Sequence, residues 1–123
     1  MQIVQLSDLH VGGLFKEDAF NTIVNEVNEL SPDVVIISGD LTDDGLIFQF
    51  QQARSLIQKI KCPNLIALPG NHDYRHTGYL LFKKFFPFSN QIHEYENLVI
   101  LTLGTVHSFP TRRSSDLDRK SVV

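Results

Sequence analysis

The order of apolar segments in the first half of the chain constrains the fold most strongly. Residues 2–6, 34–37 and 64–68 each read as a short strand, and residues 34–37 are a continuous Val-Val-Ile-Ile run. Such β-branched runs are typical of strands buried on both faces of a parallel sheet. The segments between these strands are amphipathic and helical in pattern. Because strands that alternate with helices form βαβ units, we predict an α/β fold whose first three strands are parallel.

The helical segments are identified by the spacing of their apolar residues. Between residues 17 and 30 apolar side chains recur every three or four positions, and Ser31-Pro32 ends the pattern. A second stripe runs from Ala53 to Ile60 and stops before Cys62-Pro63. We therefore predict that, along the chain, one helix precedes the second strand and one follows it.

The pattern beyond the third strand is less regular. We predict a short helix at residues 79–86 and two strands at residues 92–95 and 98–103. Glu96-Asn97 would form the tight turn that joins these strands.

Composition and charge exclude several classes of protein. The chain has 123 residues, of which 42% are hydrophobic, and a formal net charge of −3, so we expect one domain at most and no basic nucleic-acid-binding surface. Its apolar runs are shorter than the ~20 residues of a membrane helix. The start Met-Gln-Ile-Val-Gln-Leu has no signal-peptide pattern, and Cys62 has no second cysteine to pair with. We therefore expect a cytoplasmic protein with a reduced thiol. The oligomeric state is not indicated.

Polar side chains follow all three predicted parallel strands. The strand ends read Ser-Asp-Leu-His at 7–10, Ser-Gly-Asp at 38–40 and Gly-Asn-His-Asp at 70–73. Ligands of open α/β sheets bind at the carboxyl ends of the strands. Each motif alone also has an ordinary explanation as a helix cap, a turn or a solvated histidine. Their occurrence at three consecutive strand ends favours a binding site.

The residue types at these strand ends suit a divalent metal centre. Asp8 and His10 are two positions apart, and in an extended segment such residues point to the same side, so both can reach one cation. The carboxylate of Asp40 has two oxygens and can bridge two cations. Asn71 offers a neutral carbonyl oxygen. This mixture favours Mn, Fe or Zn over Ca or a thiolate-type zinc site.

The motifs Asp-Leu-His, Gly-Asp-Leu-Thr-Asp and Gly-Asn-His-Asp resemble those of the metallophosphoesterase (calcineurin-like phosphoesterase) superfamily, over about residues 1–106. The resemblance implies an incomplete fold, the N-terminal βαβαβ portion of a β-sandwich flanked by helices. It also implies a dinuclear metal centre. Asp8 and His10 would hold the first ion, Asp40 would bridge both, and Asn71 would hold the second.

The resemblance gives the two residues after Asn71 different roles. His72 would contact the phosphate and help to protonate the leaving oxygen instead of binding metal. We expect Asp73 to orient His72 by accepting a hydrogen bond, with a simple turn cap as the alternative.

The implied activity is hydrolysis of a phosphodiester, in which a metal-bridging hydroxide attacks phosphorus in line. The Gly39–Asp43 and Gly70–Asp73 motifs look most like the branch that contains bacterial cyclic-nucleotide phosphodiesterases, so we predict a cyclic-nucleotide-like or related small substrate. Two alternatives stay open. One is a non-catalytic scaffold of the same superfamily, against which the presence of His72 argues. The other is a nuclease, although nucleic acid is the less favoured substrate.

The family pattern is incomplete in this chain. The superfamily has a further histidine and a Gly-His-x-His segment after the Asn-His motif, and these supply the remaining metal ligands. Beyond residue 76 this chain has only His93 and His107, neither in a matching context. We therefore expect the chain itself to be inactive, although the longer parent protein would be an enzyme.

The last segment, residues 107–123, reads HSFPTRRSSDLDRKSVV. From Arg112 onward it can be back-translated to CGACGCTCTTCCGATCT followed at once by its own reverse complement, and this DNA resembles a sequencing-library adapter. We therefore interpret residues 107–123 as a non-biological tail and residues 1–106 as the N-terminal part of a metallophosphoesterase domain. A genuine basic, Ser-rich tail is the alternative.

Overall fold

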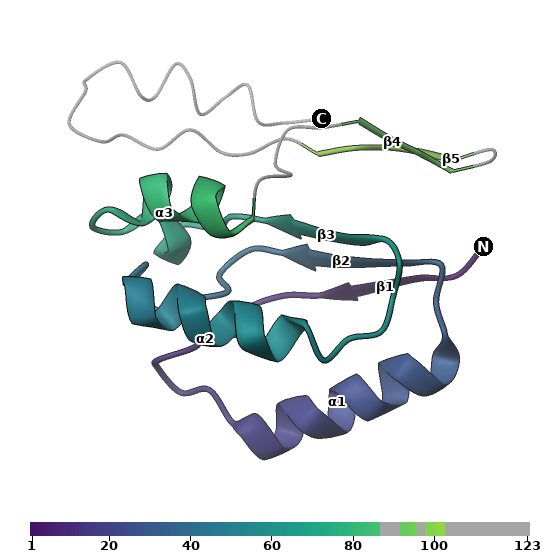
Figure 1. Ribbon diagram of the computed structural model, residues 1–123, viewed down its shortest axis with the longest axis horizontal. Coiled ribbons are helices and arrows are strands. Elements are labelled where there is room, and N and C mark those ends of the chain that lie inside the picture. The colour runs from purple at the N-terminus through teal and green to yellow at the C-terminus, as the bar shows by residue number, and fades with distance from the viewer. Residues whose placement is uncertain (87–91, 96–97, 103–123) are drawn as a thin grey trace.

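The computed structural model describes residues 1–86, 92–95 and 98–102. The predicted order of strands and helices is confirmed, with boundaries that differ by a few residues. Its elements, labelled in Figure 1, are β1 (Ile3–Leu6), α1 (Glu17–Leu30), β2 (Val34–Ser38), α2 (Ile47–Ile57), β3 (Leu65–Leu68), the 3-10 turn η1 (His72–Tyr74), α3 (Gly78–Phe85), β4 (Ile92–Tyr95) and β5 (Leu98–Leu101). The turn predicted at residues 96–97 and the segment 107–123 lie outside the described residues.

The first three strands form one parallel sheet in the order β1-β2-β3. Leu6 pairs with Ile37, and Ser38 pairs with Leu68, so the strands are in register at their carboxyl ends. The predicted parallel arrangement is confirmed, and it brings the three polar strand ends to one edge of the sheet. The strands β4 and β5 form a separate antiparallel pair, also as predicted.

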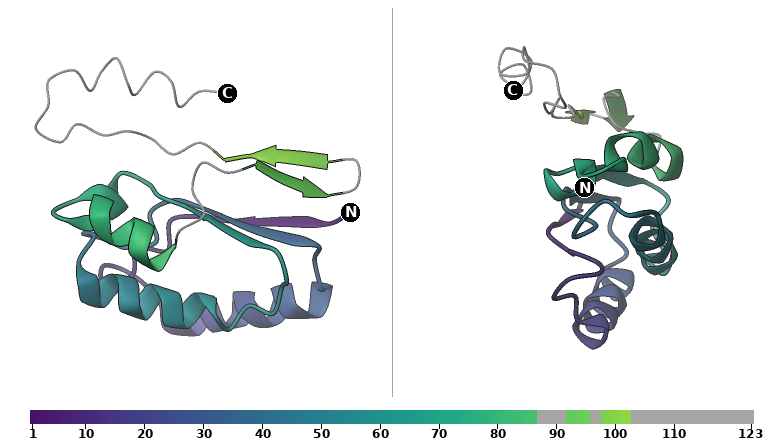
Figure 2. Two further views of the ribbon diagram at one scale, coloured as in Figure 1. Left: turned by 45° about the horizontal axis from the view of Figure 1, so that its top comes forward. Right: turned by 90° about the vertical axis from the view of Figure 1, so that its left-hand side faces the viewer.

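Two helices cover one face of the parallel sheet, as Figures 1 and 2 show from different sides. In α1 the buried residues Phe20, Val24 and Val27 recur at helical spacing, and this stripe faces the sheet. The helix ends at Ser31, whose left-handed backbone (φ 49°) lets its N–H bond to the carbonyl of Val27 before Pro32. Burial of these apolar side chains fixes the helix against the strands.

An aromatic cluster attaches α3 to α2. The ring of Phe50, which is fully buried, lies with its centroid 6.1 Å from that of Phe82 and is stacked 5.8 Å from that of Phe85. Aromatic pairs at these separations are stabilising beyond the area that they bury. The cluster therefore holds the middle and end of α3 against α2. None of the helices in the described ranges is long and apolar enough to cross a membrane.

Candidate metal centre

The loops after β1 and β2 run side by side beyond the ends of the strands. The N–H of Asp8 donates to the carbonyl of Gly39 (3.1 Å), and the N–H of His10 donates to the carbonyl of Asp40 (2.9 Å). An isolated parallel bridge between Val11 and Thr42 extends the pairing further. Because backbone hydrogen bonds fix these loops against each other, the side chains that they carry are held in a defined arrangement.

Three candidate ligands have left-handed backbones, with φ of 60° at Asp8, 51° at His10 and 54° at Asp40. Non-glycine residues seldom adopt this conformation, and its strain is typical of functional sites. The expectation that Asp8 and His10 lie in an extended segment is therefore wrong. Their side chains nevertheless approach each other, with His10 Nε2 3.5 Å from Asp8 Oδ1.

The side chains of Asp8, His10 and Asp40 meet at one point. The Nε2 atom of His10 lies 3.5 Å from Asp8 Oδ1 and 3.7 Å from Asp40 Oδ2. One donor atom from each of the three residues lies within 4.8 Å of the others. The structure thus brings together the residues proposed for the first metal ion.

Glycine at position 70 allows the loop after β3 to approach Asp40 closely. A Cβ atom there would overlap the Oδ1 atom of Asp40 and lie 2.5 Å from its backbone nitrogen. The same Oδ1 accepts a hydrogen bond from the N–H of His72 (2.9 Å). Asn71, the residue between Gly70 and His72, lies at the same edge of the sheet, and its side chain is exposed. Asp40 is therefore one of the contacts between the second and third strand ends.

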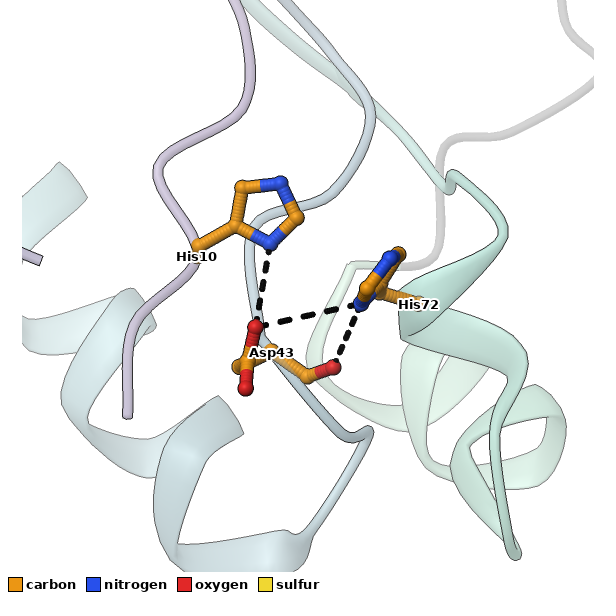
Figure 3. A group of neighbouring side chains, drawn as sticks. All are labelled: His10, Asp43 and His72. Carbon is orange, nitrogen blue, oxygen red and sulfur yellow. Dashed lines mark hydrogen bonds and ion pairs between the residues drawn. The ribbon is translucent and has the colours of Figure 1, made fainter. Parts of the chain in front are cut away.

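Asp43 connects the two histidines, as Figure 3 shows. Its Oδ1 atom lies 3.3 Å from Nδ1 of His10 and 3.8 Å from Nδ1 of His72. Its backbone carbonyl is 2.7 Å from Nδ1 of His72. Since a carbonyl oxygen only accepts hydrogen bonds, this contact places the proton of His72 on Nδ1 and leaves Nε2 to exchange a proton.

The residues His10, Asp43 and His72 also form a second group that could hold a metal ion. However, Nδ1 of His72 donates to the Asp43 carbonyl and cannot bind a cation at the same time. We therefore interpret this group as a hydrogen-bonded set that positions the histidines.

Asp73 ties the second and third loops together. Its carboxylate is fully buried and accepts hydrogen bonds from the N–H groups of Leu41 (3.1 Å), Thr42 (2.8 Å) and Gly70 (2.9 Å), and from the Thr42 hydroxyl (2.9 Å). Burial raises the pKa of Asp73, and the four donors oppose that rise. The expected hydrogen bond from His72 is not among these contacts. Asp73 instead holds the backbone of both loops.

The donor set fits a divalent cation. Two carboxylates and an imidazole are ligand types that Mn, Fe and Zn accept. In this structure one of each residue's ligand atoms lies close to those of the other two. A cation bound between the two carboxylates would offset their mutual repulsion.

Comparisons with known proteins agree with this geometry. The family model described as calcineurin-like phosphoesterase matches residues 1–118, and the chain belongs to this family. An uncharacterized metallophosphoesterase of Helicobacter pylori (strain J99) is 35% identical over 80 residues, which are 62% of this chain and 20% of that protein.

Two further relatives align over similar lengths. The uncharacterized metallophosphoesterase YkuE of Bacillus subtilis is 32% identical over 84 residues, which are 67% of this chain and 29% of that protein. A protein named "Probable cyclic nucleotide phosphodiesterase" from Synechococcus sp. is 30% identical over 81 residues, which are 59% of this chain and 31% of that protein. The chain thus matches about a fifth to a third of the length of these curated relatives.

Sequence reasoning missed Asp43 as a site residue. The signal was present, since Asp43 is the last residue of the Gly-Asp-Leu-Thr-Asp motif, three positions after Asp40. Only the fold shows that the turn after Thr42 returns this carboxylate toward His10.

Proposed function

We propose that the complete protein, of which residues 1–106 form the N-terminal part, is a metal-dependent phosphodiesterase. The main observation in favour of this proposal is that Asp8, His10 and Asp40 converge beside His72 at the carboxyl edge of the parallel sheet. A cyclic-nucleotide-like or related small phosphodiester is the proposed substrate, supported by the name of the Synechococcus relative. A cytoplasmic location remains part of the proposal, supported by the single free thiol of Cys62.

The proposed centre holds two divalent ions, either Mn, Fe or Zn. Asp8 and His10 would bind the first ion, Asp40 would contribute to both, and Asn71 would bind the second. When bound, such ions act as Lewis acids toward the phosphoryl oxygens and increase the acidity of water.

The protein's own side chains position the two histidines, one of which would move a proton. The contact between the His72 Nδ1–H and the Asp43 carbonyl keeps one proton on Nδ1. In the imidazolium form of the ring, the second proton is on Nε2, and Nε2 is then the atom that would deliver a proton to the leaving oxygen. Asp43 also faces Nδ1 of His10, which leaves Nε2 of that ring toward Asp8 and Asp40. Asp73 keeps the two loops at a fixed separation.

The chain of 123 residues is proposed to be inactive alone, because the later histidine ligands of the superfamily have no counterpart in it. Residues 107–123 remain a proposed non-biological tail, although the family match reaches residue 118. Sequencing the source locus beyond the codon for Val106 tests both statements. A reading frame that continues to a Gly-His-x-His segment supports them, whereas a genomic HSFPTRRSSDLDRKSVV followed by a stop codon contradicts them.

Hydrolysis by the complete protein tests the proposed function. After removal of metal with a chelator, the protein should not cleave cyclic AMP or bis(4-nitrophenyl) phosphate, and added manganese should restore activity. Asp40→Asn should lower kcat by at least about 100-fold, because the residue contacts both loops and is proposed to bind both ions. Asp18→Asn, an exposed carboxylate in α1, is the control and should retain activity.

Other outcomes identify the alternatives. Tight manganese binding without hydrolysis of any phosphoester would favour the non-catalytic scaffold. Cleavage of DNA or RNA without cleavage of the small diesters would favour the nuclease.

A further inference from the structure

The peptide unit between Asp43 and Asp44 lies between His72 and a buried glutamine of α2. Its carbonyl oxygen, which belongs to Asp43, accepts the hydrogen bond from Nδ1 of His72 at 2.7 Å, as Figure 3 shows. Its N–H, which belongs to Asp44, donates to Oε1 of Gln49 at 2.8 Å. Because a trans peptide is planar and its C=O and N–H point in opposite directions, the two contacts hold the plane from opposite sides. Gln49 thereby fixes the direction in which the Asp43 carbonyl points.

The side chain of Gln49 is enclosed, although it lies in the first turn of a helix. Only 3% of the residue is exposed. The backbone of Gly12, in the loop after β1, approaches the amide so closely that a Cβ atom at Gly12 would overlap Nε2 of Gln49. In a close-packed interior such a side chain has few alternative positions. The acceptor atom for the Asp44 N–H is therefore held in place.

The neighbouring peptide units of this turn have other partners. The N–H of Asp43 donates to the carbonyl of Val11 at 3.0 Å, and the N–H of Gly45 donates to the hydroxyl of Thr42 at 3.0 Å. Neither contact involves Gln49. The peptide unit between Asp43 and Asp44 is therefore the part of the turn whose orientation depends most directly on Gln49.

Arg75 also approaches the Asp43 carbonyl, with Nη1 at 3.4 Å. The same Nη1 atom lies nearer to Oδ1 of Asp44, at 3.0 Å, and the arginine side chain is 49% exposed. Exposed ion pairs of this kind contribute little to holding a conformation. The buried amide of Gln49 is therefore the stronger constraint on the peptide plane.

A cap of α2 is the ordinary explanation for a glutamine at this position. Oε1 of Gln49 does lie 3.4 Å from the N–H of Leu46, the residue that precedes the helix. The contact with Asp44 is shorter, and Asp44 lies outside the helix. The geometry therefore favours a role in the turn that carries Asp43 in addition to the cap.

We propose that Gln49 is a positioning residue, which orients the ring of His72 through the peptide unit between Asp43 and Asp44. The proposal rests on the proposed phosphodiesterase function, in which His72 delivers a proton to the leaving oxygen. Without the Gln49 acceptor the peptide can rotate and present an N–H to His72. An N–H pairs with an unprotonated Nδ1, so a rotated peptide selects the opposite tautomer of the neutral ring.

Kinetics of the complete protein with manganese test this role. Gln49→Met keeps the length of the side chain and removes the acceptor. We expect kcat to fall about tenfold for cyclic AMP, whose alkoxide leaving group needs a proton, and by less than about twofold for bis(4-nitrophenyl) phosphate. Gln52→Met is the matched control, because Gln52 is an exposed glutamine of the same helix, and it should change neither rate.

Two kinetic outcomes would overturn the proposal. Equal losses for both substrates in Gln49→Met would mean that the residue acts only as a cap of α2. A further tenfold loss for cyclic AMP when Gln49→Met is added to His72→Asn would mean that Gln49 does not act through His72. If it does act through His72, the second change should add almost nothing, because the two effects are not independent.

The tautomer of His72 gives a readout that needs no catalysis. The imidazole ¹⁵N NMR signals of His72 are recorded in the metal-free complete protein at a pH at which the ring is neutral. We expect the Nδ1–H form in the unmodified protein and in Gln52→Met, and a shift toward the Nε2–H form in Gln49→Met. That shift without hydrolysis of any ester would support the positioning role while contradicting the proposed function. The Nε2–H form in the unmodified protein would overturn the proposal even if Gln49→Met failed to fold, and an unchanged tautomer in a folded Gln49→Met would overturn it even if the protein cleaved both substrates.

Discussion

The carboxylate of Asp43 lies 3.3 Å from Nδ1 of His10, on the side of the ring opposite the two carboxylates that approach Nε2. A metal-binding histidine is oriented by the hydrogen bond at its other nitrogen. We therefore predict that Asp43→Asn weakens manganese binding by about 10- to 100-fold, measured by calorimetric titration of the complete protein.

The neighbouring carboxylate provides a matched control for Asp43. Asp44 pairs with Arg75 at 3.0 Å on the surface. Asp44→Asn should leave manganese affinity unchanged within about twofold, since surface ion pairs contribute little. Equal loss of affinity in both variants would show that Asp43 acts only through general negative charge.

Asp73→Asn should destabilise the fold. One carboxylate oxygen of Asp73 accepts hydrogen bonds from Leu41 and Gly70, and the other accepts two from Thr42. An asparagine places an NH₂ group against one of these pairs and leaves buried donors without an acceptor. We expect a loss of about 3 kcal/mol in the free energy of unfolding, measured by urea denaturation of the complete protein.

A surface carboxylate shows whether burial causes that loss. Asp33 also accepts a backbone hydrogen bond, from the N–H of Gln2 at 2.7 Å, but it is exposed. Asp33→Asn should cost no more than about 1 kcal/mol, because water can replace the lost contact. A similar cost in the two variants would contradict the assignment of Asp73 as the residue that joins the loops.

Gly70→Ala should disrupt the metal centre without removing any ligand. The added methyl group would overlap the carboxylate of Asp40, and the loops after β2 and β3 would have to separate. We expect at least a tenfold loss of manganese affinity, because candidate ligands misplaced by even ~1 Å bind a cation poorly. Unchanged affinity together with an unmoved Asp40 in a crystal structure of the variant would show that the close approach is not required.

The sequence predicted the framework well because its signals are local. The apolar stripe of residues 17–30 and its Ser31-Pro32 stop match α1, and the β-branched run starting at Val34 matches β2. The meeting of Asp8, His10 and Asp40 also follows from parallel strands that end at one edge. These features depend on periodicity and topology, which a single sequence carries.

The details of the loops could not be predicted in the same way. The left-handed backbones of Asp8 and His10 depend on pairing with the loop after β2, which is a tertiary contact. Apart from the N–H of Gly70, the partners of Asp73 are backbone N–H groups and one hydroxyl more than thirty positions earlier. Asp43 reads as an ordinary turn residue until the fold places it between two imidazoles. Non-local hydrogen bonds thus determine the parts of the site that sequence patterns do not show.

The nature of the leaving group should decide how much His72 contributes to catalysis. Its Nδ1 is held by the Asp43 carbonyl at 2.7 Å, so the imidazolium form would donate its proton from Nε2. An alkoxide leaving group requires that proton, whereas 4-nitrophenolate departs readily without it. We therefore predict that His72→Asn lowers kcat about 100-fold or more for cyclic AMP but much less for bis(4-nitrophenyl) phosphate. His76→Asn is the control, because His76 is exposed and asparagine tolerates its left-handed backbone (φ 54°). Equal losses for both substrates in His72→Asn would mean that His72 binds phosphate and does not donate a proton.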